Sequence, residues 1–404
     1  MMFWRHPRPA GPLPLAVVLV ALVAPACGAT ATGAAAPAAA TVAVIAVPPP
    51  SASPTTTDAV PPPVPSTTTS PTTATTSTST TTSSPTITAT STTIAEPPPS
   101  LDALRAAALG LADGNAAVSV SVWRAGAPLF GWASGSRVDG SAVDSDTPFV
   151  IASVSKLVTA ITVARLVQRD DIHPGDRVPW DAIGVAHDRA WNDVTVGELL
   201  AHTSGMPVNR KSWLDEPGTC DVPLTAALAT PPTPARGTWV YSNGNYCALG
   251  LLVQHTSGMP LDKAANDLVF EPASVAGPYL STEGVRASSA PYAKGVARLE
   301  RLGGAGTWLA SSDDIAAMLA AVTVADLETL RWPGIIVDQY GWGHTGTIDG
   351  AKACAWVLDE RSTVLVAMVS GQRPRTGGEV CDMLLPALAT DLGVWAGDPV
   401  RNPL

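Results

Sequence analysis

A serine and a lysine three positions apart are the first residues of this sequence whose types could do chemistry together. They lie in Ser153-Val154-Ser155-Lys156, where a helical pattern begins among apolar residues. Positions i and i+3 share one face of a helix, so the Lys156 amine can reach the Ser153 hydroxyl. Burial lowers the pKa of an amine, which lets it act as a base. The spacing therefore predicts a serine nucleophile activated by a lysine. The alternative is a lysine that reaches solvent from a helix start.

A tyrosine and an asparagine form the second motif, Tyr241-Ser242-Asn243, which directly precedes another apolar helical pattern. A phenol beside a nucleophile can carry a proton to a leaving group when nearby cations lower its pKa. The Asn243 side chain offers a donor and an acceptor, which suits it to hold Lys156 and a substrate amide. This tripeptide is common in loops, so its interpretation depends on the other two motifs.

A glycine-containing segment, Trp342-Gly343-His344-Thr345-Gly346-Thr347, precedes a strand-forming region. Glycines let a ligand approach a strand backbone closely, and an edge strand can pair with an extended, peptide-like substrate. An amide of this strand, together with that of Ser153, would then form an oxyanion hole. The alternative is a glycine-rich turn without a binding role.

The elements that position these motifs are strands at both ends of the folded region and helices between them. Alternating apolar residues predict strands at 117–123, 129–133, 354–358 and 363–369. Helices are predicted from residue 101 onward and at 155–168, 196–202, 246–255, 313–321 and 380–392. This order predicts an α+β fold, with an antiparallel sheet built from both termini of the domain, flanking helices and a helical subdomain.

The hexapeptide His-Thr-Ser-Gly-Met-Pro occurs twice, at 202–207 and 255–260, each time after a helical apolar run. Gly205 and Gly258 lie where a helix C-terminus favours a left-handed residue, and the prolines prevent continuation. We interpret both copies as helix-stop signals and assign neither histidine a catalytic role.

The N-terminal region has the pattern of an export signal followed by a linker. Arg5 and Arg8 precede an apolar run too short to span a bilayer, and small residues follow up to Cys27. Residues 1–27 are predicted to be an export signal ending in a bacterial lipobox, with lipidation at Cys27; cleavage to a freely secreted form is the alternative. Residues 28–99 are almost entirely Ala, Pro, Thr and Ser, which is typical of a disordered spacer. The folded domain is expected over residues 100–404.

The remaining four cysteines indicate disulfides, because an exported chain with an even number usually pairs them. Three pairings are possible, of which we favour Cys220–Cys247 and Cys354–Cys381. In the chain-entropy model, each would stabilise the fold by about 3 kcal/mol.

Composition excludes some classes of function. The chain has 34 acidic and 24 basic residues, a net charge of −10 and no basic cluster, which argues against nucleic-acid binding. It has no C-x-x-C motif and no histidine cluster, so no metal site is predicted. The sequence also has no phosphate-binding loop, dinucleotide fingerprint or G-x-S-x-G motif, so no cofactor is expected.

The order of the three motifs resembles the serine β-lactamase and D,D-peptidase superfamily: S-x-x-K at Ser153, Y-S-N at Tyr241 and H-T-G at His344. Within it, the sequence is similar to the branch holding class C β-lactamases, D,D-carboxypeptidases and related esterases. The stretches 196–205 and 306–314 also resemble segments of this family. The resemblance covers roughly residues 101–392 and implies a β-lactamase/transpeptidase-like fold.

The resemblance also implies a role for each matching residue. Ser153 would attack a carbonyl and form an acyl-enzyme, with Lys156 and Tyr241 sharing proton transfer. The Thr347 amide would complete the oxyanion hole with that of Ser153. The substrate-binding residues would be Asn243, His344, Thr345 and Gly346.

His344 stands where class C β-lactamases usually carry lysine, which shifts the expectation toward a peptidase or esterase. A protonated His344 would hold a substrate carboxylate, so affinity for the carboxylate is expected to weaken as pH rises through about 6.5. Arg331 is a candidate for a second carboxylate contact.

The sequence thus predicts an exported serine hydrolase that acts on D-Ala-type cell-wall peptides, β-lactams or esters. Its partners would be these small or peptide substrates and, through a lipid on Cys27, the membrane. It would lie on the outer face of the cytoplasmic membrane or be secreted. The alternative is a catalytically weak surface module that binds cell-wall peptides or a protein partner.

Overall fold

The computed structural model describes residues 99–208, 211–330, 335–338, 340–358 and 363–393. All of them fall in one compact unit, Thr90–Leu404. Cys27, the predicted export signal, residues 28–98 of the predicted linker and Arg331 lie outside the described residues. Among the described helices, none combines the length and hydropathy needed to cross a bilayer.

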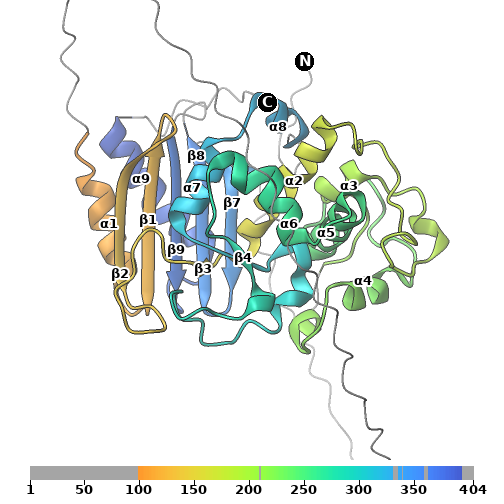
Figure 1. The fold of residues 1–404 in the computed structure, drawn as a ribbon, viewed down its shortest axis with the longest axis horizontal. Helices are drawn as coiled ribbons and strands as arrows, with labels where there is room; N and C mark the ends of the chain where they lie inside the picture. The colour runs from red at the N-terminus through yellow and green to blue at the C-terminus, as the bar shows by residue number, and fades with distance from the viewer. Residues whose placement is uncertain (1–98, 209–210, 331–334, 339, 359–362, 394–404) are drawn as a thin grey trace, which may run out of the picture. The chain divides into compact units, whose positions relative to one another are not determined.

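A six-stranded antiparallel sheet forms the first layer, in the order β2-β1-β9-β8-β7-β6 (Figure 1). Its central strands β9 and β8 are buried along their whole length. The N-terminal hairpin thus pairs with the C-terminal strands, as the α+β prediction required. The strands are β1 (Ala117–Arg124), β2 (Ala127–Gly135), β6 (Ile336–Asp338), β7 (Gly341–Ile348), β8 (Ala351–Leu358) and β9 (Thr363–Ser370).

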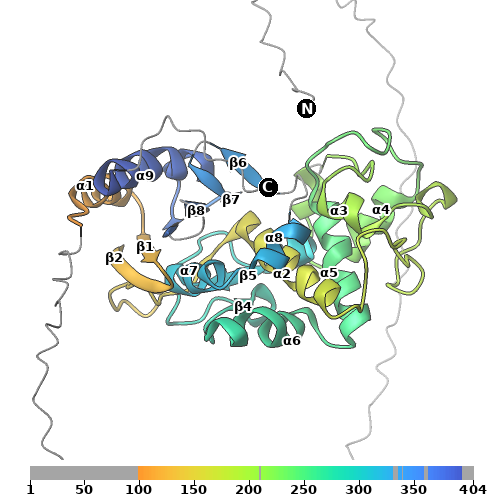
Figure 2. The ribbon, with the colours of Figure 1, turned by 90° about the horizontal axis from the view of Figure 1, so that it is seen from above.

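Two helices from opposite ends of the domain cover one face of this sheet. Helices α1 (Asp102–Ala112) and α9 (Gly377–Leu392) pack against each other, and α9 lies on β8 and β7 (Figure 2). Their buried leucines form one apolar cluster with alternate residues of β1, β8 and β9. The Cys354–Cys381 disulfide joins β8 to α9 within this cluster.

The other face carries α7 (Ser312–Ala320) against β1 and β9, and α2 (Ser155–Gln168) against β7. Helix α2 is apolar on nearly all sides because it is central: it contacts α5, α6 and α8 as well as the sheet. A small second sheet, in the order β3-β5-β4, leads into it. Its strands are β3 (Phe149–Val150), β4 (Tyr279–Leu280) and β5 (Trp308–Ala310).

The helical subdomain lies beyond α2, on the side away from β1 and β2 (Figure 1). Its longest helix, α5 (Asn243–Ser257), contacts α2, α3 and α4. The other helices are α3 (Val196–Leu200), α4 (Asp221–Leu228), α6 (Leu261–Ala265) and α8 (Val324–Leu330). The short helical turns are η1 (Ala152–Val154), η2 (Arg189–Trp191), η3 (Lys211–Leu214), the π-helical η4 (Asn266–Phe270), η5 (Glu271–Ala273), η6 (Ser281–Glu283) and η7 (Leu299–Ala305).

The interpretation of the repeated hexapeptide is correct for one copy only. Gly258 caps α5 with a left-handed φ of 68°. In the first copy, α3 already ends at Leu200, and His202 takes the left-handed conformation with φ 55°. Gly205 instead allows Pro232 to pack closely against the backbone, because a Cβ on Gly205 would lie 2.6 Å from the Pro232 side chain.

Candidate active site

The predicted nucleophile lies in a tight turn between a strand and the central helix. Ser153 is half-buried in η1, directly before α2. Its neighbour Ala152 has a φ of 47°, a strained conformation for a residue with a Cβ. Strand β7 abuts this turn, since a Cβ on Gly346 would lie 2.3 Å from the Ile151 carbonyl oxygen. Only glycine permits this approach, which brings the edge of the sheet to the nucleophile.

Lys156 is buried to 1% exposure and makes three hydrogen bonds inside the site. Its Nζ donates to Ser153 Oγ at 3.2 Å, to Asn243 Oδ1 at 2.7 Å and to the Ala305 carbonyl at 3.0 Å. It forms no ion pair with a described carboxylate, so nothing offsets the loss of solvent. Desolvation therefore lowers the pKa of Lys156 well below its usual range. The expected helix-face geometry and direction of the pKa shift are both present.

Tyr241 reaches the same serine from the loop before α5. Its phenol is hydrogen-bonded to Ser153, and its ring centroid lies 4.9 Å from Lys156 Nζ. Burial raises the pKa of Tyr241 to about 12, and the bond to Ser153 only partly opposes this. The lowering by nearby cations that the sequence interpretation required is thus not found, because desolvation outweighs the hydrogen bond to Ser153. The phenol is neutral at neutral pH.

Asn243 is the first residue of α5, and its position depends on the cap before it. Ser242 is the N-cap residue, and its hydroxyl accepts from the Gly244 amide at 3.2 Å. This cap turns the chain so that Tyr241 and Asn243 face Ser153 and Lys156. In the second motif, Ser242 therefore caps α5, while Tyr241 and Asn243 supply side chains to the site.

The third motif forms β7, and its outer edge is partly open. Strand β6 pairs with β7 only from Gly341 to Gly343, so no described strand pairs with the outer edge from His344 onward. Thr345 is half-buried and Thr347 is exposed, and the Thr347 hydroxyl accepts from the Gly377 amide at 2.8 Å. An extended ligand would have access to this part of the strand.

His344 differs from the sequence-based expectation. Its Nδ1 donates to the Thr345 carbonyl at 2.6 Å, and its Nε2 is buried without a protein partner among the described residues. Burial, together with the nearby Lys156, lowers the pKa of His344 to about 3. The imidazole of the free protein is therefore neutral around pH 6.5, and the pH dependence of carboxylate binding stays a prediction.

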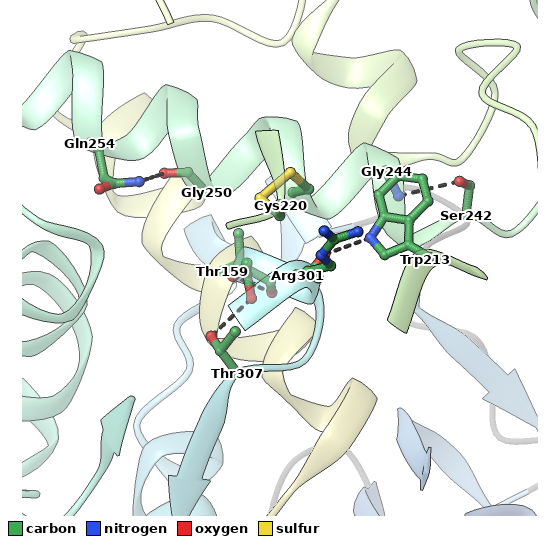
Figure 3. The surroundings of a disulfide bond; sticks show 12 residues. Thr159, Trp213, Cys220, Ser242, Gly244, Gly250, Gln254, Arg301 and Thr307 are labelled. Carbon is green, nitrogen blue, oxygen red and sulfur yellow. Dashed lines mark hydrogen bonds between the residues drawn. A yellow bond between two sulfur atoms is a disulfide. The ribbon is translucent and has the colours of Figure 1, made fainter. Parts of the chain in front are cut away.

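The Cys220–Cys247 disulfide lies among residues of α2, α5 and η7 (Figure 3). It joins the start of α4 to α5 and packs on η7, where a Cβ on Gly303 would lie 2.4 Å from Cys220 Sγ. Two residues later, Ala305 supplies the carbonyl that binds Lys156. Both predicted disulfides are present, and this one braces a wall of the site.

A cavity of about 630 Å³ borders the same region. Apolar side chains such as Val208 and Val222 line it, together with the cation Arg301. Trp213 also lines it and packs near the start of α5, since its ring would lie 3.3 Å from a Cβ on Gly244. Within the described part of the chain, no group of three or more histidine, cysteine or acidic residues could hold a metal ion.

A half-buried serine beside a buried lysine, in an α+β domain with a partly unpaired strand edge, is an arrangement that suits a serine hydrolase. The β-lactamase family model matches residues 104–389. The chain therefore belongs to the β-lactamase family and is a serine hydrolase of that family.

Individual relatives are more distant. An unguisins hydrolase from Aspergillus violaceofuscus is 26% identical over 191 residues, which are 44% of this chain and 32% of that protein. Penicillin-binding protein 4 from Amycolatopsis lactamdurans is 30% identical over 140 residues, 34% of this chain and 37% of that protein. The chain thus covers about a third of the length of these curated relatives.

A solved structure supports the fold over most of the domain. The D-amino acid amidase from Ochrobactrum anthropi SV3, complexed with D-phenylalanine, superposes with a TM-score of 0.58. The match covers 71% of this chain and 99% of the amidase at 20% identity.

Proposed function

We propose that this chain is an exported serine hydrolase that forms an acyl-enzyme on Ser153 and acts on D-Ala-type cell-wall peptides or related D-amino-acid amides, β-lactams or esters. The observation that carries the proposal is the environment of Lys156. Its amine is buried, has no described ionic partner and lies 3.2 Å from Ser153 Oγ. An amine that loses its proton readily, at that distance from a hydroxyl, is a general base for nucleophilic attack.

In the proposed acylation, the Lys156 amine removes the Ser153 proton as Oγ bonds to the substrate carbonyl carbon. The carbonyl oxygen becomes an oxyanion, which the Ser153 and Thr347 amides would stabilise. When the carbon–nitrogen or carbon–oxygen bond breaks, Tyr241 donates its phenolic proton to the leaving group. A pKa near 12 suits Tyr241 to this donor role. The proton on Lys156 then returns to Tyr241, and water hydrolyses the acyl-enzyme.

Asn243, Thr345 and Gly346 would orient the substrate along β7. Asn243 holds Lys156 through Oδ1, and its side-chain amide is of the type that can also donate to a substrate carbonyl. The open edge of β7 after Gly343 suits an extended backbone. His344 would contact the substrate as a neutral ring and would not attract a carboxylate by charge.

The substrate class draws support from the relatives. One is named as a penicillin-binding protein and another is an amidase with a bound D-amino acid. Neutral His344 favours amides, peptides and esters over substrates selected by a carboxylate. Export draws support from the N-terminal sequence and from the two disulfides, which persist in oxidising compartments.

A substrate panel tests this proposal. The full chain is assayed with a D-Ala-D-Ala peptide, a D-amino-acid amide, a β-lactam and a simple ester, with Ser153→Ala as the control. Turnover of at least one substrate that disappears in Ser153→Ala supports the proposal. No turnover of any of them, with retained binding of the peptide, would favour the alternative of a surface binding module.

A further inference from the structure

One buried histidine near the site lies outside all three motifs, S-x-x-K, Y-S-N and H-T-G. It is His202, in the first copy of the repeated hexapeptide, and it is 1% exposed. The corresponding His255 of the second copy lies in α5 and is exposed. The same six residues thus have two different structures.

The backbone of His202 is unusual for its residue type. The Thr203 amide donates to the Glu198 carbonyl at 2.9 Å, which closes the end of α3 around a left-handed residue. Glycine or asparagine usually occupies that position because other side chains are strained there. A histidine in it is a strained outlier beside a functional site, and this points to a requirement for its side chain.

The contacts of His202 show what the side chain provides. Its backbone carbonyl accepts from the Val240 amide at 2.9 Å, and its Nδ1 accepts from the Ser242 amide at 3.4 Å. His202 therefore binds the residue on each side of Tyr241. The ring centroids of His202 and Tyr241 are 4.7 Å apart. The Asn245 side-chain amide also donates to Nδ1, at 2.9 Å.

We propose that His202 is a positioning residue, which holds the Tyr241–Asn243 turn through a neutral Nδ1 acceptor so that the phenol reaches Ser153 and the amide reaches Lys156. This inference rests on the proposed function of that site. Two N–H groups donate to Nδ1, so the ring carries its proton on Nε2 and acts only as an acceptor toward the turn. Burial and the nearby Lys156 lower the pKa of His202 to about 3, which keeps Nδ1 unprotonated.

The test compares two substitutions that both suit a left-handed backbone. His202→Gly removes the acceptor, and His202→Asn keeps a short side-chain oxygen near the Nδ1 position. His255→Gly is the matched control in the identical hexapeptide. The rate constant for covalent modification of Ser153 by a fluorophosphonate is measured, together with the probe's dissociation constant before reaction and the melting temperature.

His202→Gly should lower the modification rate constant on the order of 10²-fold, because displacement of a catalytic group by about 1 Å has that effect. The dissociation constant should change little, and His202→Asn should recover most of the rate. His255→Gly should react as the wild type does. A folded His202→Gly that reacts at the wild-type rate, or a folded His202→Asn as slow as His202→Gly, would overturn the inference.

A second measurement determines the tautomer of His202 in the wild-type protein. Nitrogen-15 spectra of histidine-labelled protein should show a buried ring with the proton on Nε2, and this signal should disappear in His202→Asn. A proton on Nδ1 of the ring assigned to His202 would contradict the proposed acceptor, whereas His344 should show its proton on Nδ1. If the wild-type protein itself does not react with the probe, the proposed function fails, and the tautomer still reports on the geometry.

Discussion

The two disulfides close loops of equal length, but one lies in the sheet layer and the other lies beside the proposed active site. Each joins cysteines 27 residues apart, so the loops they close are equal in length. Cys354–Cys381 lies between β8 and α9, in an apolar cluster that contains none of the proposed site residues. Cys220–Cys247 lies between α4 and α5, against η7, whose carbonyl at Ala305 binds Lys156.

Each region also holds a buried lysine. Lys352 in β8 is 2% exposed and donates to the Gly371 carbonyl at 2.7 Å. Lys156 has the serine, the asparagine and a carbonyl around it. The disulfide and the buried lysine of the sheet layer thus belong to the core of the sheet, whereas Lys156, on the central helix α2, and the Cys220–Cys247 disulfide, in the helical subdomain, support the proposed reactive centre. Whether a buried lysine or a disulfide serves stability or catalysis thus depends on the residues around it.

The largest difference between the regions is expected for the lysines. Lys156→Met should lower the acylation rate by about 10²–10⁴-fold, because it removes the general base. Lys352→Met should leave that rate nearly unchanged. The measurement is the rate of Ser153 modification by a fluorophosphonate in both variants. Equal loss in the two variants would mean that Lys156 has only a structural purpose.

A smaller but still large effect is expected for Tyr241. Tyr241→Phe should lower turnover of an amide substrate by about 10²-fold or more, since the proton donor to the leaving group is lost. Tyr246→Phe is the control, because its ring also lies near Lys156, at 5.7 Å, but its hydroxyl contacts the Leu200 carbonyl. Full amide turnover in Tyr241→Phe would exclude the donor role.

Removing each disulfide should sharpen the comparison. Replacing either cysteine pair by serines should cost roughly 3 kcal/mol of unfolding free energy, because the closed loops are equal. Only loss of Cys220–Cys247 should also lower acylation in the folded protein, by several-fold, as the wall behind Lys156 loosens. Urea unfolding and initial rates at low temperature separate the two effects. A loss of rate for both pairs, or for neither, would remove the distinction.

The last of these predictions concerns acid stability and not the reaction rate. Unfolded histidines take up protons near pH 6.5, whereas His202 and His344 do so only near pH 3 in the folded protein. Between these values the unfolded state binds more protons, so the unfolding free energy should fall as pH decreases from 6.5 toward 3. Urea unfolding at several pH values checks the slope, which should be shallower in His202→Asn. If the pH dependence of the unfolding free energy is the same in His202→Asn as in the wild type, His202 does not contribute to it.

Much of the fold followed from local patterns. The predicted helix at 155–168 has the bounds of α2, and the four predicted strands lie within β1, β2, β8 and β9. Alternation, apolar periodicity and glycine caps are local signals, so a single sequence carries them. The pairing of Cys354 with Cys381 followed from placing one on a strand and the other on the last helix.

What the sequence did not predict depends on contacts between distant segments. The two hexapeptides are identical, yet His202 is buried because the chain returns at Val240–Asn245, whereas His255 is exposed on α5. Likewise, the pKa directions of Tyr241 and His344 depend on how deeply the closed site buries them. His202 adopts a left-handed backbone conformation although it is not glycine. The sequence around His202 does not indicate this conformation, because it arises only in the folded backbone.

The most direct test of the central claim is the identity of the acylated residue. The full chain is incubated with a β-lactam or a fluorophosphonate, and the modified peptide is located by mass spectrometry. The account predicts one added mass on Ser153, lost in Ser153→Ala and retained in Ser155→Ala. Labelling of Ser155 or Ser242 in place of Ser153, or labelling that persists in Ser153→Ala, would contradict it.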